Sequence, residues 1–127
     1  YNGAPRGRKN CVDLNYCTRE KMNIPSGERY ELCRSVHAEA NCIISAARKD
    51  TLGATLYMAC RNPKTGELIP YSTSCSMCRR LIINAGIQRV VIRDTQEEYR
   101  VVDVEEWVEQ DDSLPVFAGE QVCGKCE

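Results

Sequence analysis

The sequence has little of several features on which whole classes of protein depend. Among its 127 residues there is one histidine, His37, so any histidine ligand or histidine base must be this residue. The formal net charge is −1, which gives no basic surplus of the kind that binds a polynucleotide backbone. No stretch approaches the roughly 18 apolar residues of a membrane span, and no basic-then-apolar secretory leader is visible. We therefore expect a cytoplasmic protein with no membrane partner, and the charge argues weakly against a polynucleotide partner.

Cysteine, by contrast, is abundant, with nine copies. The number is odd, and two pairs have the C-x-x-C spacing that in an intracellular chain favours metal binding over disulfides. The length and the 43% hydrophobic content are enough for one core without disulfide support. We expect a single domain over residues 1–127, with a cysteine-rich segment at 1–34 and a C-terminal extension of unknown role at 94–127. Because Tyr1 opens directly into turn-forming residues, we also expect that elements preceding this loop are missing.

Three stretches have the apolar spacing of helices. They are residues 36–49 with Ser35 as the expected cap, residues 76–84 with Gly86 as the stop, and residues 104–109 after Asp103. Two short apolar runs, 54–59 and 89–92, predict strands. Since one helix joins these strands, they should be parallel neighbours in a βαβ unit. The alternation of helices and strands predicts an α/β layered domain.

The residues that can carry chemistry are HAE at 37–39 and CSMC at 75–78, each at the start of an expected helix. Cys75 and Cys78 are three apart and share one helix face, where a helix N-terminus favours the thiolate form that a metal needs. With His37 they make three ligands, which leaves the fourth position of a tetrahedral zinc to water, as in catalytic sites. Glu39 can line the pocket without binding the metal. We predict zinc on these three residues and proton transfer by Glu39, as in the zinc nucleobase deaminases.

Each of these residues also has a structural explanation. His37 can be a capping residue, Cys75 and Cys78 can form a structural zinc knuckle or a redox pair, and Glu39 can simply favour the helix N-terminus. A structural zinc site tends to have four protein ligands, whereas a catalytic site has three and water. The number of ligands therefore separates an enzyme from a zinc-stabilised binding module without turnover.

Longer stretches resemble the deoxycytidylate (dCMP) deaminases within the zinc-dependent cytidine deaminase family. Residues 36–44, VHAEANCII, resemble the zinc helix of that family, and 81–87, LIINAGI, resemble the stretch after its second zinc motif. Residues 1–7, YNGAPRG, look like its Tyr-Asn-Gly substrate loop. Residues 24–29 and 31–34 resemble segments of the bacterial late-competence branch. The resemblance covers about residues 1–93 and leaves the tail unexplained.

This resemblance implies a cytidine deaminase-like three-layer α/β/α fold with a mixed central sheet, to which a missing N-terminal part would add a helix and a hairpin. It implies hydrolysis of dCMP to dUMP and ammonia, with zinc hydroxide as the nucleophile and Glu39 as the proton shuttle. Deamination of cytidine, guanine or an adenosine in RNA is the alternative within the same class. The family's members are often homo-oligomers regulated by dCTP and dTTP, so both effectors and self-association are expectations here.

The resemblance also suggests three substrate-binding residues. Asn2 matches an asparagine that binds the sugar or phosphate, although an Asn-Gly turn also explains it. Ala38 would offer its backbone N–H to the pyrimidine carbonyl, and Ser74 would lie near the leaving amine. Ser74 stands where the family usually has proline, and the loop at 61–73 is longer than the family's usual crossing. Both departures alter the wall beside the metal, so they bear on the substrate more than on the reaction.

Cys11, Cys17 and Cys33 form a second cluster in the cysteine-rich segment. The resembled bacterial branch carries an extra structural zinc in this region. Asn10 stands where a histidine is expected, so a fourth ligand is missing from the local sequence, and Cys123 or Cys126 is a candidate to complete the set. The alternative is a group of free, partly buried thiols.

Overall fold

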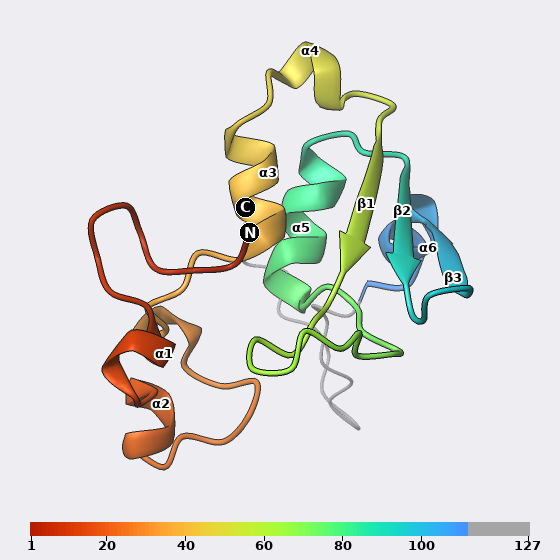
Figure 1. Cartoon of the computed structure of the whole chain (residues 1–127). Helices are drawn as coiled ribbons and strands as arrows, with labels where there is room; N and C mark the ends of the chain where they lie inside the picture. The colour runs from red at the N-terminus through yellow and green to blue at the C-terminus, as the bar shows by residue number, and fades with distance from the viewer. Residues whose placement is uncertain (112–127) are drawn as a thin grey trace, which may run out of the picture.

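The structure is a computed structural model that describes residues 1–111 (Figure 1). The expectations for Cys123 and Cys126 lie outside these residues. At the centre is a three-stranded sheet in the order β1-β2-β3, formed by β1 (Thr55–Ala59), β2 (Arg89–Arg93) and β3 (Tyr99–Asp103). The first pair is parallel and the second antiparallel, so the sheet is mixed. The predicted α/β class and mixed sheet are confirmed.

The crossover between the parallel strands is α5 (Ser76–Asn84), which has the predicted bounds. Cys75 is its N-cap, in an extended backbone conformation. After the helix, Gly86 takes a φ of 76°, a left-handed conformation that glycine adopts without steric cost. The parallel register aligns Thr55 with Arg89, as the βαβ prediction requires.

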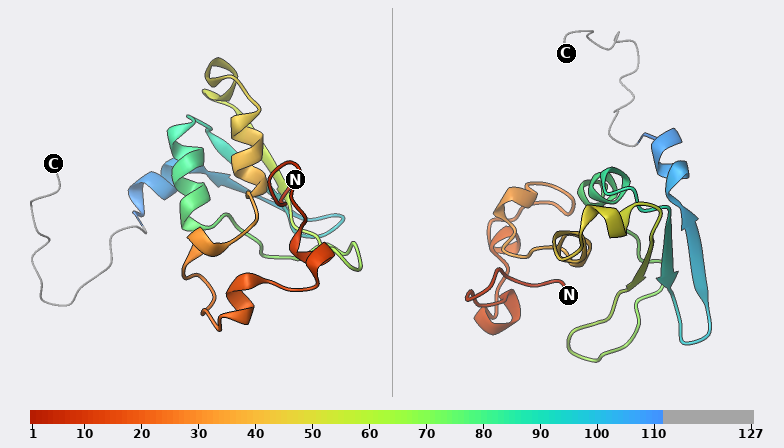
Figure 2. Two further views of the ribbon diagram at one scale, coloured as in Figure 1. Left: turned by 90° about the vertical axis from the view of Figure 1, so that its left-hand side faces the viewer. Right: turned by 90° about the horizontal axis from the view of Figure 1, so that it is seen from above.

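One face of the sheet packs against helices and forms the core. In β1 this face carries Leu56, which is buried, and Met58, which is partly buried. The layer above consists of α5, α3 (Ala38–Ile44) and α6 (Val104–Glu109), as two further views show (Figure 2). The buried core residues are Leu56, Ile82, Ala85, Ile87, Val90, Ile92 and Val104. The sheet therefore serves as the floor on which the helices carrying HAE and CSMC are fixed.

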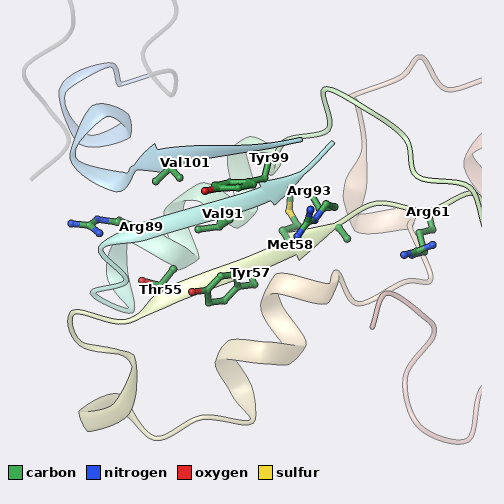
Figure 3. Close-up of a pocket in the computed structure, with 10 residues that line it drawn as sticks. Thr55, Tyr57, Met58, Arg61, Arg89, Val91, Arg93, Tyr99 and Val101 are labelled. Atoms are coloured by element: carbon green, nitrogen blue, oxygen red, sulfur yellow. The ribbon is translucent and has the colours of Figure 1, made fainter. Parts of the chain in front are cut away.

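The opposite face of the sheet is exposed within residues 1–111. Side chains alternate between the faces of a strand, so Tyr57 and Tyr99 point away from the core, with 78% and 59% of their surface exposed. A shallow cavity of about 630 Å³ lies over this face, rimmed by Arg89 and Arg93 (Figure 3). Of the three expected layers, the described residues thus show the sheet and one helical layer.

The first helix differs from its prediction at both ends. It begins at Ala38 rather than at residue 36, because the backbone of Val36 pairs with Gly3 in an isolated antiparallel bridge. His37, not Ser35, is therefore the N-cap. The helix ends at Ile44, and a separate short helix, α4 (Arg48–Thr51), follows. There the Arg48 side chain donates to the carbonyl of Asn84 at 3.0 Å, a tertiary bond that the helical spacing could not indicate.

The remaining elements are short. Residues 1–34 contain α1 (Cys11–Leu14), α2 (Thr18–Lys21) and a 3-10 turn (Tyr30–Leu32), none of which was predicted. Strand β3 was also missed, whereas α6 has the predicted bounds and its Asp103 side chain accepts from the N–H of Glu105. Within residues 1–111, no helix has the length and apolar character needed to span a membrane.

Candidate metal centre

Two helix N-termini bring the three predicted ligands together. His37 is the N-cap of α3, Cys75 is the N-cap of α5, and Cys78 lies in the first turn of α5. The two helices pack side by side on the sheet with these ends at the same edge of the layer (Figure 1). Both helix ends carry positive potential, which stabilises thiolates.

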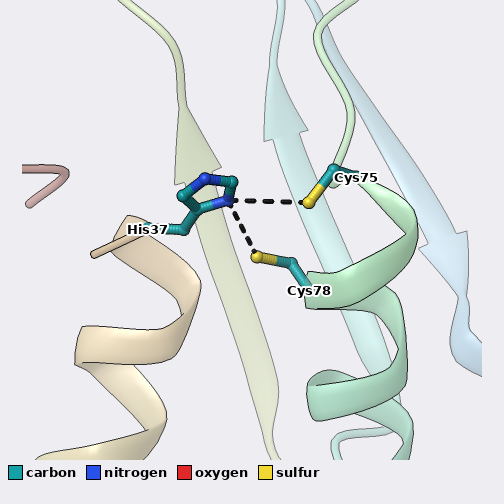
Figure 4. Close-up of side chains that lie close together, drawn as sticks. All are labelled: His37, Cys75 and Cys78. Atoms are coloured by element: carbon teal, nitrogen blue, oxygen red, sulfur yellow. Dashed lines mark hydrogen bonds between the residues drawn. The ribbon is translucent and has the colours of Figure 1, made fainter. Parts of the chain in front are cut away.

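The spacing of the three side chains fits a tetrahedral metal ion. Nδ1 of His37 lies 3.5 Å from Sγ of Cys75 and 3.3 Å from Sγ of Cys78 (Figure 4). Zinc with bonds of about 2.3 Å to sulfur and about 2.05 Å to nitrogen holds these atoms about 3.6 Å apart. All three ligand atoms lie within 4.8 Å of one another, and within residues 1–111 no other set of three His, Cys, Asp or Glu side chains is so close.

The electrostatics of the site also favour a cation. Cys78 is 1% exposed, and its burial, followed by the nearby Glu39 carboxylate and Cys75, raises the pKa of its thiol. A raised pKa opposes formation of the thiolate. A bound dication overcomes this, because a coordinated thiol is deprotonated. The donor set of one nitrogen and two sulfurs suits zinc.

Glu39 lies beside the three ligands but is not a member of their close group. Its Oε1 atom accepts a hydrogen bond from the hydroxyl of Ser74 at 2.8 Å. Ser74 is 2% exposed and comes directly before Cys75. The arrangement therefore has three candidate metal ligands and one separate carboxylate, which is what a proton shuttle next to a metal requires.

A cavity of about 730 Å³ opens at Glu39. Asn2 and Ala38, two of the three residues predicted to bind substrate, line it. The loop that carries Asn2 is attached to α3, because Gly3 pairs with Val36 and the side chain of Asn41 donates to the carbonyl of Tyr1 at 2.9 Å. The start of the chain and the HAE helix thus form one wall of this cavity.

Arg61 was not among the predicted site residues, yet it lines the same cavity. It is the one lysine or arginine among the described residues that do so. Its Nη1 donates to the carbonyl of Gly66 at 2.9 Å, within the long loop that follows β1. The only sequence signal for Arg61 was the unusual length of that loop.

Cys11, Cys17 and Cys33 are all partly buried and lie near one another. Burial, and then the neighbouring Cys17 and Cys33 thiols, raise the pKa of Cys11, while Arg34 lowers it. Their ligand atoms do not meet the close spacing that distinguishes the His37 group within residues 1–111. A second zinc on this cluster stays a prediction.

Comparison with known proteins agrees with this geometry. Residues 1–94 match the family described as the cytidine and deoxycytidylate deaminase zinc-binding region. The chain belongs to this family. The matched segment contains the three candidate ligands, Glu39 and Ser74.

Among the relatives of this deaminase-family chain is the deoxycytidylate deaminase of Mycobacterium phage D29, which is 38% identical over 96 residues. The aligned part covers 72% of this chain and 63% of the phage protein, so the chain spans less than two thirds of that relative's length. No solved structure matches the chain. The family assignment therefore rests on the sequence match, and the fold agrees with it.

Proposed function

We propose that the protein catalyses the hydrolytic deamination of a pyrimidine nucleotide, with dCMP as substrate and dUMP and ammonia as products. The observation that carries the proposal is the separation of roles at one edge of the helical layer. His37, Cys75 and Cys78 form a group with zinc spacing, while Glu39 stays outside that group and faces a cavity. A structural zinc site has no need for such a carboxylate.

Bound zinc supplies a Lewis acid and lowers the pKa of a coordinated water toward about 7. The chain's own residues do the rest. Ser74 engages one carboxylate oxygen of Glu39. The carboxylate takes the two protons of the attacking water one at a time, and passes the first to the ring nitrogen and the second to the departing amine. The backbone N–H of Ala38, at the start of α3, is offered to the pyrimidine carbonyl.

Two residues at the cavity support an anionic substrate. Arg61 brings a guanidinium, the group best suited to a phosphate, and Asn2 can donate to the sugar or the phosphate. The printed name of the phage relative, deoxycytidylate deaminase, supports dCMP among the pyrimidine nucleotides. A homo-oligomer regulated by dCTP and dTTP, and a structural zinc at Cys11, Cys17 and Cys33, belong to the same proposal.

The test is ammonia release by zinc-loaded protein from dCMP, with CMP, deoxycytidine and guanine as parallel substrates and with dCTP present or absent. Turnover of dCMP that far exceeds the others supports the proposal. Turnover of another base keeps the chemistry and contradicts the substrate. Zinc binding with no turnover of any of them contradicts the enzyme and favours a binding module. Metal analysis of the same sample tests the second site: two zinc ions per chain support it, and one contradicts it.

A matched pair of variants tests the phosphate contact. Arg61→Gln should raise the KM for dCMP and leave the weaker turnover of deoxycytidine unchanged, since the nucleoside has no phosphate. Arg89→Gln makes the same substitution at a residue that does not line the cavity at Glu39 and serves as the control. Equal loss on both substrates would contradict a phosphate role for Arg61.

A further inference from the structure

The hydroxyl of Ser74 is buried where a polar atom needs a partner. Ser74 is 2% exposed and is among the most completely buried side chains of the described chain. Buried hydroxyls are nearly always hydrogen-bonded, and here the bond goes to Oε1 of Glu39 at 2.8 Å. The next contact of the hydroxyl, to Sδ of Met58 at 3.6 Å, is a much weaker one. The carboxylate is therefore the main partner of this hydroxyl.

The backbone of Ser74 is fixed independently of its side chain. Nε of Arg79, one turn into α5, donates to the carbonyl of Ser74 at 3.1 Å. The guanidinium of Arg79 also lies over the ring of Trp107 in α6, 5.0 Å from its centroid. Ser74 thus presents its hydroxyl from a segment that two helices hold in place.

We propose that Ser74 is a positioning residue that holds the carboxylate of Glu39 in the orientation needed for proton transfer. The inference rests on the proposed function. Glutamate has three side-chain torsions, and a hydroxyl bond to one charged oxygen restricts them strongly. With Oε1 anchored, Oε2 is the oxygen that takes and returns the proton. Since small misplacement of a catalytic group can cost a large factor in rate, this anchor acts on turnover rather than on substrate binding.

This assignment differs from the earlier expectation that Ser74 lies near the leaving amine. A side chain that is 2% exposed, and whose hydroxyl already bonds to Glu39, acts on the substrate through that glutamate. It also gives a physical reason for a serine at this position: proline has no side-chain donor to offer to the carboxylate.

The test compares Ser74→Ala, Ser74→Thr and Ser72→Ala in zinc-loaded protein. Ser72→Ala is the matched control, because its hydroxyl donates to the carbonyl of Ile69 and not to Glu39. We expect Ser74→Ala to lower kcat about 10- to 100-fold, the cost of a lost hydrogen bond to a charged group, with KM nearly unchanged. Ser74→Thr, which keeps the hydroxyl, should restore most of the rate, and the control should match the wild type.

Two further readouts separate positioning from a general structural effect. Zinc content, and the visible spectrum of the cobalt-substituted protein, should be the same in Ser74→Ala and wild type, since the three ligands are untouched. In a Glu39→Gln background, Ser74→Ala should have little further effect on kcat, because the residue acts through Glu39. A full additional loss there, a changed cobalt spectrum, or unchanged kcat in the single variant would each overturn the proposal.

Ammonia release by the wild-type protein distinguishes a failure of the proposed function from a failure of the role assigned to Ser74. A wild-type protein that binds zinc and releases no ammonia from any substrate overturns the proposed function. An active wild type whose Ser74→Ala variant is equally active overturns the role of Ser74 alone.

Discussion

Replacing Glu39 by glutamine is the most direct test of the site, because the structure predicts what the substitution keeps and what it removes. Oε1 of Glu39 accepts from Ser74 at 2.8 Å. The amide oxygen of glutamine can accept the same bond, which places the NH2 group where Oε2 was. That group donates hydrogen bonds but cannot accept a proton, so the shape of the site is kept and the shuttle is lost.

The expected magnitude follows from this exchange. General acid–base catalysis by one positioned group contributes about 10²- to 10⁴-fold, or about 2.7–5.4 kcal/mol of barrier. We expect the kcat of Glu39→Gln to fall at least about 10²-fold below that of the wild type. Zinc content should stay at the wild-type value, because Glu39 is outside the group of ligand atoms. KM should change little, because glutamine matches glutamate in volume.

The assay is ammonia release from dCMP with zinc measured on the same samples. Glu109→Gln, an exposed glutamate at the end of α6, removes the same charge and should leave kcat unchanged. A Glu39→Gln protein that retains zinc and turns over within about threefold of the wild type would refute the shuttle role. Loss of zinc from this variant would instead make Glu39 a ligand and refute the three-ligand geometry.

Three further predictions concern the framework of the site. Chelation of the metal should abolish turnover and lower the thermal midpoint, and added zinc should restore both, unless the site has no part in catalysis. In urea unfolding, Gly86→Ala should cost about 1–3 kcal/mol of stability, and more than Gly53→Ala. Both glycines have positive φ, but only at Gly86 would the new Cβ lie 2.5 Å from the side chain of Leu52. Equal losses of stability in the two variants would contradict the steric argument. Hydrogen bonding from Arg100 lowers the pKa of Asp94, so the contribution of Asp94 to stability is full above about pH 4 and is lost as pH falls through the lowered pKa. Asp94→Asn should therefore make the urea midpoint depend less on pH in that acid range, and an unchanged pH dependence would count against the pair.

The sequence predicted best those elements that local signals define. Helix α5 has apolar spacing along its length and a glycine just beyond its end, and both signals act within a few residues of the helix. The parallel pairing of β1 and β2 followed from the single helix between them. The grouping of His37, Cys75 and Cys78 could also be predicted, because a lone histidine and a C-x-x-C pair each begin a helix.

Elements that depend on distant contacts could not be predicted in the same way. Val36 has helical spacing, but its backbone pairs with Gly3, which lies 33 positions away. Strand β3 reads YRVVD, in which apolar and polar residues do not alternate, so its pairing with β2 defines it. The bond between Ser74 and Glu39 joins residues 35 apart, and no spacing rule connects them.

The long loop at 61–73 precedes Cys75, and the contacts at its end hold this candidate metal ligand in place. Its final residues are fixed by the β2–β3 turn. The N–H of Tyr71 donates to Oδ1 of Asp94 at 2.7 Å, and Arg100 donates to the carbonyl of Ser72 while it also bonds to Asp94. Asp94 is 6% exposed, so this anchor is largely shielded from water.

The first part of the loop is bonded mainly to itself: the N–H of Gly66 donates to the carbonyl of Asn62, and the N–H of Ile69 donates to the carbonyl of Cys60. From Tyr71 onward the chain is held first by Asp94 and then, at Ser74, by Arg79. An insertion near the turn can change the wall of the cavity and hence the choice of substrate. It need not displace Cys75 or the hydroxyl that holds Glu39, because the anchors lie between the insertion and the metal centre. This order of contacts along the chain would leave the residues proposed for the reaction in place when the first part of the loop varies in length.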